Sequence, residues 1–128
     1  MTSFLIITHG NFGQALLDSC ELITGKLDNY FALGLDKDDD IEKLKQIVEE
    51  KLTVLKKKGE VIVLVDILGG SPSNVANFLL KTLGGFRIIT GVNLPLLIEL
   101  SLSSEQQNEE ELVKRAAQVS KDSIMVLQ

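Results

Sequence analysis

The amino-acid sequence predicts an α/β fold: a doubly wound, mainly parallel sheet of four strands with helices on both faces, followed by a C-terminal edge strand. The first observation is that short apolar, partly β-branched runs alternate with segments of helical periodicity along the whole chain. The second is a composition typical of globular proteins, with 45% hydrophobic and 24% charged residues. A chain of 128 residues is expected to form one domain, spanning 1–128.

The first third of the chain predicts a strand, a helix and a second strand. Residues 3–8 (SFLIIT) are apolar and partly β-branched, which is typical of a buried strand. Residues 12–24 have helical spacing, and Gly25 is a suitable helix terminator. We expect the apolar face of this helix to consist of Phe12, Leu16, Cys20 and Ile23. Residues 29–34 (NYFALG) are expected to form the second strand.

The middle third predicts a helix, a strand and a helix. Acidic residues begin the segment 36–59 and lysines end it, which complements a helix dipole. Its helically spaced apolar residues are Ile41, Leu44, Val48, Leu52 and Leu55. Residues 60–66 (EVIVLVD) form the strongest strand pattern in the chain. The next helix is expected to run to about Leu83, with Ser71 as its N-cap and Pro72 at its first helical position.

The last third predicts a strand, two helices and a final strand. Residues 85–90 (GFRIIT) are expected to form the fourth strand, and a short apolar helix follows from about residue 94 to 102. The segment 103–120 is expected to begin as an exposed linker and to continue as a helix. Residues 122–127 (DSIMVL) are expected to close the chain as a fifth strand.

Composition excludes several classes of function. The net charge of −5 argues against nucleic acid or an anionic membrane surface as the main partner. No apolar run approaches the ~18 residues that a membrane-spanning helix needs, so membrane insertion is not expected. The single cysteine permits no intramolecular disulfide and favours a reducing, cytoplasmic compartment. One histidine and one cysteine do not supply a zinc site, and we expect neither a metal nor a cofactor.

Polar residues follow three of the predicted strands, at the edge where open parallel sheets bind ligands. His9 leaves the first strand, Asp66 ends the third, and the segment 91–93 (GVN) follows the fourth. Imidazole is a competent nucleophile at cellular pH. A carboxylate that accepts a hydrogen bond from one ring nitrogen leaves the other nitrogen free to attack, and Asp66 is the candidate for that role. The alternative is a loop histidine without a role and an aspartate that caps a turn.

The segment 69–74 (GGSPSN) has the composition of an anion-binding helix start. We expect the backbone N–H groups of Ser73 and Asn74 to lack intrahelical partners and, with the helix dipole, to attract an anion. Gly69 and Gly70 would let that anion approach the backbone closely. The loop contains no lysine, so it is not a Walker A sequence. An ordinary helix start explains the same residue types.

Three stretches together resemble the mannose-type enzyme IIA (EIIA) of the bacterial sugar phosphotransferase system (PTS). They are IITHGNFGQALL, VIVLVDILGGSPSNVA and ITGVNLPLLIEL, and the resemblance covers nearly the whole chain. It implies a phosphoryl carrier that accepts a phosphoryl group from the phosphohistidine of HPr and passes it to an EIIB domain or subunit. It also implies an indirect link to the membrane subunits EIIC and EIID, and a homodimer in which the last strand pairs across the two subunits.

The resemblance also assigns residues. It implies that His9 is phosphorylated and that Asp66 orients it, so that Nε2 is the reacting atom if Asp66 holds the Nδ1 hydrogen. Ser71 and the nearby main-chain N–H groups of the 69–74 loop would hold the phosphoryl oxygens. The residues expected near the site without an assigned role are Thr8, Gly10 and Asn93.

Other functions remain open on the sequence alone. A domain of this type also occurs as a phosphorylation-controlled regulatory module, in transcriptional regulators or with dihydroxyacetone kinase. Histidine phosphatases need an arginine before the histidine and a second histidine, whereas here residue 8 is Thr and His9 is the only histidine. The sugar is not specified by the sequence. The acidic segment 103–111 (SSEQQNEEE) is a candidate for the crossing to a swapped strand.

Overall fold

A computed structural model of the chain describes residues 1–102 and 108–128, and its described strands form one parallel sheet. The strand order is β2-β1-β3-β4, which is the doubly wound arrangement expected from the sequence. The strands are β1 (Ser3–His9), β2 (Tyr30–Leu35), β3 (Val61–Val65) and β4 (Arg87–Ile89). The helices are α1 (Phe12–Thr24), α2 (Ile41–Lys56), α3 (Ser71–Thr82), α4 (Leu94–Ser101) and α5 (Glu109–Asp122).

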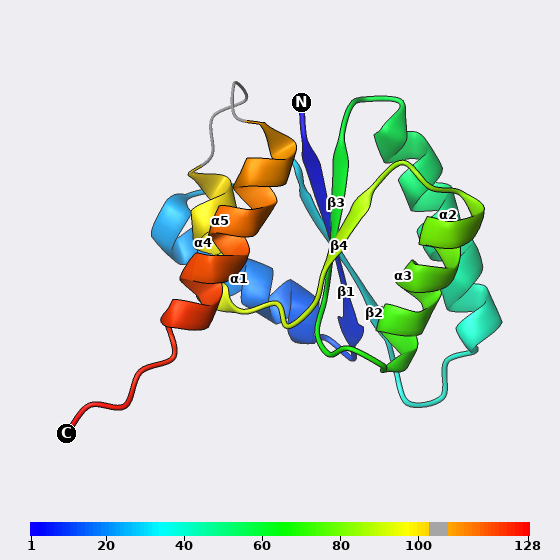
Figure 1. Cartoon of the computed structure of the whole chain (residues 1–128). Coiled ribbons are helices and arrows are strands. Elements are labelled where there is room, and N and C mark those ends of the chain that lie inside the picture. The colour runs from blue at the N-terminus through cyan, green and yellow to red at the C-terminus, as the bar shows by residue number, and fades with distance from the viewer. Residues whose placement is uncertain (103–107) are drawn as a thin grey trace.

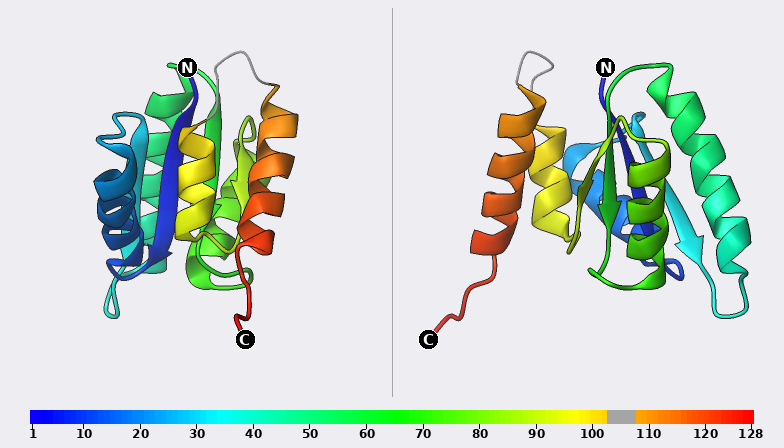
Figure 2. Two further views of the ribbon diagram at one scale, coloured as in Figure 1. Left: turned by 90° about the vertical axis from the view of Figure 1, so that its left-hand side faces the viewer. Right: turned by 45° about the vertical axis from the view of Figure 1, so that its right-hand side comes forward.

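Helices cover both faces of the sheet and create two apolar cores (Figures 1 and 2). Alternate residues of β1 and β3 point to opposite faces. Phe4 and Ile6 pack into the core beneath α1, α4 and α5, whereas Leu5 and Ile7 pack beneath α2 and α3. This two-sided burial explains why β1 and β3 have continuous apolar sequences. Among the described residues, no helix is long and apolar enough to cross a membrane.

The strand register brings distant segments to one edge of the sheet. Ile7 pairs with Val65, so His9 and Asp66 both emerge at the carboxyl ends of adjacent strands. The backbone N–H of Val92 donates to the carbonyl of Val65 at 3.0 Å, which places the β4–α4 connection at the same edge. The expectation that three separate parts of the chain would meet there is confirmed.

The predicted apolar face of α1 was partly correct: Cys20 is buried and Leu16 packs against the core, but the face is rotated toward Gly13 and Leu17. Gly13, Leu17 and Cys20 are buried, whereas Phe12 and Ile23 are exposed. Gly13 allows this rotation, because a Cβ there would lie 3.0 Å from Ile6 Cγ2. The helix therefore approaches β1 through its glycine, and a hydrophobic periodicity count that ignores glycine places the contact face wrongly.

The prediction of a fifth strand over residues 122–127 was wrong for this chain by itself. Asp122 is the last residue of α5, and the residues after Ser123 lead away from the body as an extended tail (Figures 1 and 2). A strand needs a neighbouring strand for its backbone hydrogen bonds, and the tail has none among residues 1–102 and 108–128. Its exposed apolar side chains are Ile124, Met125, Val126 and Leu127.

The predicted acidic linker is only partly described. Residues 103–107 lie outside the described part of the chain. Glu109, Glu110 and Glu111 form the first turn of α5 rather than a bridge, and Asn108 caps that turn by accepting from the N–H groups of Glu110 and Glu111. Acidic residues in a first turn are stabilised by the helix dipole, which explains why this end of the predicted linker is helical.

Candidate functional site

The His9 ring is anchored to Asp66. His9 Nδ1 lies 2.7 Å from Asp66 Oδ2, and the backbone N–H of His9 donates to the same oxygen at 2.8 Å. Because a carboxylate only accepts hydrogen bonds, the ring hydrogen in this contact is on Nδ1. The lone pair of Nε2 is therefore free in the neutral ring. The imidazole is 52% exposed and the Asp66 side chain only 13%, so the nucleophile reaches solvent while its anchor does not.

Asp66 is held as an anion by its donors. Burial raises the pKa of the Asp66 carboxyl, but hydrogen bonds from the His9 backbone, the His9 ring and the Ile67 backbone outweigh this effect and lower the pKa below its usual value. The Ile67 N–H donates to Oδ1 at 2.8 Å. Both carboxylate oxygens are thus engaged, and the side chain has a fixed orientation toward His9.

Gly70 lies directly against the imidazole. A Cβ at Gly70 would be 2.8 Å from His9 Cε1 and 3.5 Å from His9 Nε2. The glycine is needed for this close approach rather than for an unusual backbone angle, since its φ is −78°. Gly69, by contrast, has φ +88°, a left-handed conformation that favours glycine. The free Nε2 edge of the ring therefore faces the start of α3.

The start of α3 differs from the prediction by one residue. Gly70 is the N-cap and Ser71 is the first helical residue. The backbone of Gly70 is extended, and its carbonyl accepts from the N–H of Asn74 at 2.9 Å. The prediction that this N–H would be available to an anion was therefore wrong. The Asn74 side chain also donates to the Gly69 carbonyl at 3.4 Å. Among the described residues, no acceptor contacts the N–H groups of Ser71 and Ser73.

The side chains of Thr8 and Asn93 hold helices in place rather than facing the site. Thr8 is fully buried, and its Oγ1 accepts from the N–H of Gly13 at 2.8 Å, which anchors the start of α1. Asn93 Oδ1 accepts from the N–H of Leu96 at 3.0 Å and from the Ser120 hydroxyl at 2.8 Å. Asn93 therefore lies at the site edge through its backbone only. The position of Asn93 before Leu-Pro indicates a helix cap. No local sequence pattern indicates Ser120 as its second partner.

Gly10 lies beside the site in the turn after β1. The N–H of Gly10 donates to the Leu35 carbonyl at 2.7 Å. The carbonyl of Gly10 lies so close to Gly34 that a Cβ on residue 34 would collide with the carbonyl oxygen. The glycine at position 34 therefore lets the β1–α1 turn lie over the end of β2. Sequence reasoning placed Gly10 near the site but gave no reason for a glycine at 34.

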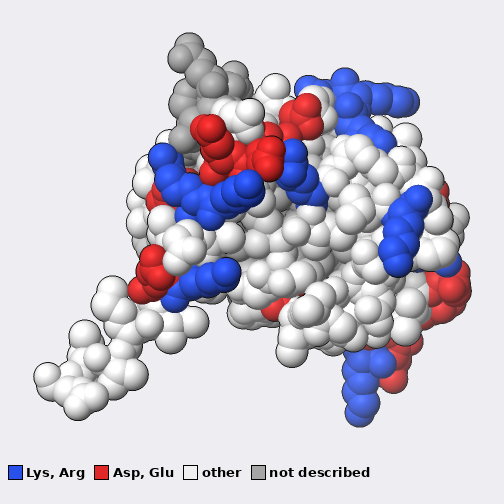
Figure 3. Space-filling model, viewed as in Figure 1, with Lys and Arg blue, Asp and Glu red and all other residues white. Residues whose placement is uncertain are grey.

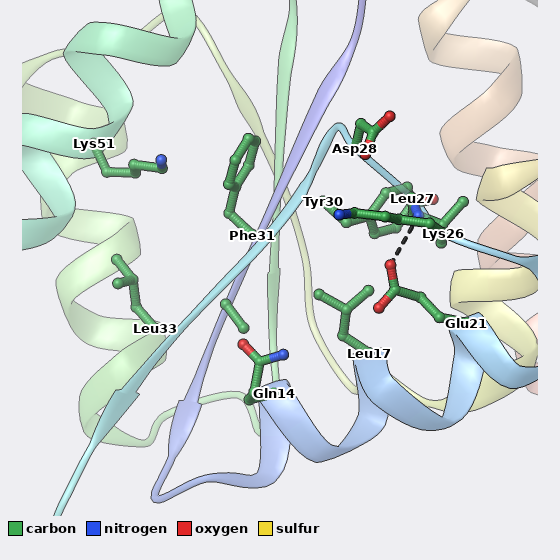
Figure 4. A pocket seen from close by; sticks show the side chains of 11 residues that line it. Gln14, Leu17, Glu21, Lys26, Leu27, Asp28, Tyr30, Phe31, Leu33 and Lys51 are labelled. Carbon is green, nitrogen blue, oxygen red and sulfur yellow. Dashed lines mark hydrogen bonds between the residues drawn. The ribbon is translucent and has the colours of Figure 1, made fainter.

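One hollow of the surface lies elsewhere, at the edge of β2 (Figure 4). It has a volume of about 470 Å³ and does not include His9 or Asp66. The Lys51 ammonium lies 4.0 Å from the centre of the Phe31 ring at this edge. A lysine beside an edge strand disfavours pairing with another chain, so we interpret this hollow as part of a protected edge. Within residues 1–102 and 108–128, no three His, Cys, Asp or Glu side chains lie together as a metal site would require.

Comparisons with known proteins agree on one family. The family model EIIA-man, described as PTS system fructose IIA component, matches residues 3–117. The fructose-specific EIIA component of Bacillus subtilis is 32% identical over 98% of this chain and 86% of its own length. The mannose-specific EIIAB component of Escherichia coli is 30% identical over 99% of this chain, which corresponds to 40% of that protein. The crystal structure of an EIIA component from Streptococcus agalactiae superimposes with a TM-score of 0.89 at 27% identity, covering 98% of this chain and 97% of that one.

Proposed function

Because the chain belongs to the EIIA-man family of phosphotransferase system components, we propose that it carries a phosphoryl group on Nε2 of His9. In this proposal HPr supplies the group from its own phosphohistidine, and an EIIB domain or subunit receives it in the cytoplasm. The observation that carries the assignment is the contact between His9 Nδ1 and Asp66 Oδ2, which leaves Nε2 as the free nitrogen.

The chemistry follows from that contact. The Nε2 lone pair attacks the phosphorus in line, the nitrogen–phosphorus bond of the donor breaks, and its electron pair returns to the donor imidazole. The His9 ring keeps its hydrogen on Nδ1 and gains positive charge, which the anionic Asp66 compensates. Transfer to the acceptor is the same step in reverse. Such transfer depends on positioning and charge stabilisation, so a rigid ring is the main requirement.

The start of α3 is the proposed binding site for the phosphoryl oxygens. The N–H groups of Ser71 and Ser73 and the Ser71 hydroxyl are the proposed donors, at the positive end of the helix dipole. Gly69 leaves the backbone open to the group, whereas the space beside Gly70 is taken by the His9 ring. Asn74 contributes by closing the first turn rather than by donating its own N–H. Without a fixed cation, the group is held weakly enough to leave again.

We propose that the chain forms a homodimer through its tail. Of the described strands, β4 pairs only with β3, so its outer edge offers unpaired backbone groups. A hollow of about 310 Å³ beside it is bordered by Leu68, Leu80 and Ile88, which suit an apolar strand, and by Gly69, Ser73 and Asn74 at the start of α3. The exposed tail after Ser123 would supply that strand from the partner subunit. The opposite edge, β2, is protected by Lys51 (Figure 4).

The names of the relatives do not decide the sugar. Fructose and mannose belong to the names of those proteins. In the proposed pathway the membrane subunits EIIC and EIID select the sugar. The matches to transport components over nearly the whole chain favour the carrier function over a regulatory module.

The decisive experiment is intact-mass analysis after incubation with enzyme I, HPr and phosphoenolpyruvate. We expect the protein to gain one acid-labile phosphoryl group, and His9→Ala to gain none while keeping its circular dichroism spectrum. Nitrogen NMR of the phosphorylated protein should place the group on Nε2. A folded protein that gains no phosphoryl group from active HPr would refute the carrier function, and phosphorylation of His9→Ala would refute the site.

A further inference from the structure

Two large apolar side chains are exposed immediately after Asp66. Ile67 is 60% exposed and Leu68 is 77% exposed, both in the connection between β3 and α3. Ile67 Cγ2 would be 3.1 Å from a Cβ at Gly70, the same position that lies 2.8 Å from His9 Cε1. Ile67 and the imidazole therefore border the same small space beside Gly70. Neither side chain contributes to the two cores, and Leu68 also borders the hollow beside β4.

We propose that Ile67 and Leu68, here called the apolar pair, are the main docking contact for the protein that presents a phosphohistidine to His9. This inference rests on the proposed carrier function. Reacting atoms approach to about 3–3.5 Å before transfer, so the surface of the donor protein must cover the residues that flank Nε2. On the β3–α3 side, Ile67 borders the space beside Gly70 that the ring also borders, and Leu68 is the next residue of the same exposed connection.

The surface around the apolar pair has the character of an interface centre. In Figure 3 the surface over the β3–α3 connection is nearly free of charged side chains, and the charged groups lie around it. The centres of protein interfaces are depleted of charge and contain the few large side chains that carry most of the binding energy. Relay complexes of this kind bury less than about 1,200 Å², so two apolar side chains are a large share of the contact.

The same pair should serve the acceptor as well as the donor. Both transfers use Nε2 of His9, and the phosphoryl group leaves by the side from which it arrived. The two partner proteins must therefore cover the same residues and exclude each other. Loss of the apolar pair should weaken both transfers together, whereas a contact specific to one partner would weaken only one.

The test compares Leu68→Ser with Leu22→Ser. Leu22 is 89% exposed near the end of α1, so the control removes the same side chain from a surface away from the site. Four quantities are measured for both variants and the wild type: kcat/KM with phosphorylated HPr, the affinity for unphosphorylated HPr, the rate of His9 phosphorylation by phosphoramidate, and the sedimentation coefficient. The sedimentation coefficient of Leu68→Ser should equal that of the wild type, so that a loss of transfer is not a loss of the dimer. Phosphoramidate is a small donor that needs no docking surface. Leu68→Met is included as the conservative variant.

We expect Leu68→Ser to lose about tenfold in kcat/KM and in HPr affinity, as for the loss of a contact worth about 1.4 kcal/mol. Its phosphoramidate rate should equal that of the wild type, Leu68→Met should recover most of the loss, and Leu22→Ser should behave as the wild type. Equal kcat/KM and HPr affinity for Leu68→Ser and Leu22→Ser would overturn the docking proposal alone. A matching loss with phosphoramidate would also overturn it, because Leu68 would then act on the ring. A wild-type protein that neither donor phosphorylates would overturn the carrier function itself.

Discussion

One oxygen atom of Asp66 defines the reactive geometry at the scale of single residues. Oδ2 accepts from both the backbone N–H and the ring of His9, so the main chain and the side chain of His9 are held by the same oxygen atom. Oδ1 is meanwhile held by the N–H of Ile67. The ring therefore cannot rotate without breaking a charged hydrogen bond, and Nε2 keeps its direction toward α3.

Replacement of Asp66 by asparagine should reduce both stability and phosphoryl transfer. An amide offers one oxygen, so either the two donors of His9 or the N–H of Ile67 faces an NH₂ group. We expect a loss of about 1–3 kcal/mol in the free energy of unfolding, measured by urea denaturation at pH 7. Asp18→Asn, on the exposed face of α1, is the matched control. Wild-type stability and transfer rate in Asp66→Asn would contradict the anchoring role.

The difference in stability between the wild type and Asp66→Asn should depend on pH. Hydrogen bonds hold the pKa of folded Asp66 below its usual value despite partial burial. The carboxylate therefore stabilises the fold above the unfolded pKa of about 3.9, and this stabilisation is lost as the pH falls through the folded pKa. Urea midpoints measured between pH 7 and pH 3 should converge for the two proteins at the acidic end. A constant difference over that range would contradict the assigned cause.

Gly70→Ala should separate activity from stability. The φ of −78° suits alanine, but the added Cβ would lie 2.8 Å from His9 Cε1 and must displace the ring. We expect at least a tenfold loss in the rate of transfer from phosphorylated HPr, equal to about 1.4 kcal/mol, with little change in the thermal midpoint. Asn77→Ala, on the exposed face of the same helix, serves as the control. An unchanged rate would mean that the ring position is not critical.

At the scale of elements, Asn93 joins two helices to the site edge. Its Oδ1 caps α4 through Leu96 and also accepts from Ser120, which belongs to α5. The neighbouring Val92 is bonded to the end of β3. One short segment thus connects the sheet edge, α4 and the last helix before the tail.

Asn93→Ala should therefore destabilise the fold without altering the chemistry. Loss of the cap and of the acceptor for Ser120 should cost about 1–3 kcal/mol in unfolding free energy. A double-mutant cycle with Ser120→Ala should give a coupling of about 0.5 kcal/mol or more. Asp40→Ala, which removes the exposed cap of α2, is the comparison for a cap without a second partner. Zero coupling would contradict the bridging role, and a selective loss of transfer rate would restore Asn93 as a site residue.

At the scale of the whole molecule, the parallel sheet assembles the site and leaves one apolar segment uncovered. The tail after Ser123 has four exposed apolar side chains. A chain that ends at Ser123 should sediment as a folded monomer at micromolar concentration, whereas the full chain should sediment as a dimer. A full chain that is monomeric at that concentration, or a shortened chain that remains dimeric, would contradict the proposed exchange of tails.

Some details could not be predicted from the sequence because they depend on contacts between residues that are far apart in the chain. The period of α1 was correct, but its buried face depended on how Gly13 meets Ile6. The N-cap of α3 shifted to Gly70, and Asn74 lost its free N–H, because the extended loop after Asp66 sets where the helix begins. The final strand needed a neighbour that the chain alone does not provide.

The sequence by itself determined the order of the first four strands and of the helices along the chain, the continuous burial of β1 and β3, and the choice of His9 and Asp66 as candidate site residues. Local periodicity is sufficient for the elements, because they depend on neighbours along the chain, and the two candidate residues follow from their places at the ends of predicted strands. Only the tertiary structure decided that Oδ2 of Asp66 holds Nδ1, that Gly70 supports the ring, and that Ile67 and Leu68 stand exposed beside it. Those relations arise where strands far apart in sequence end at one edge, and their distances are set by register and packing.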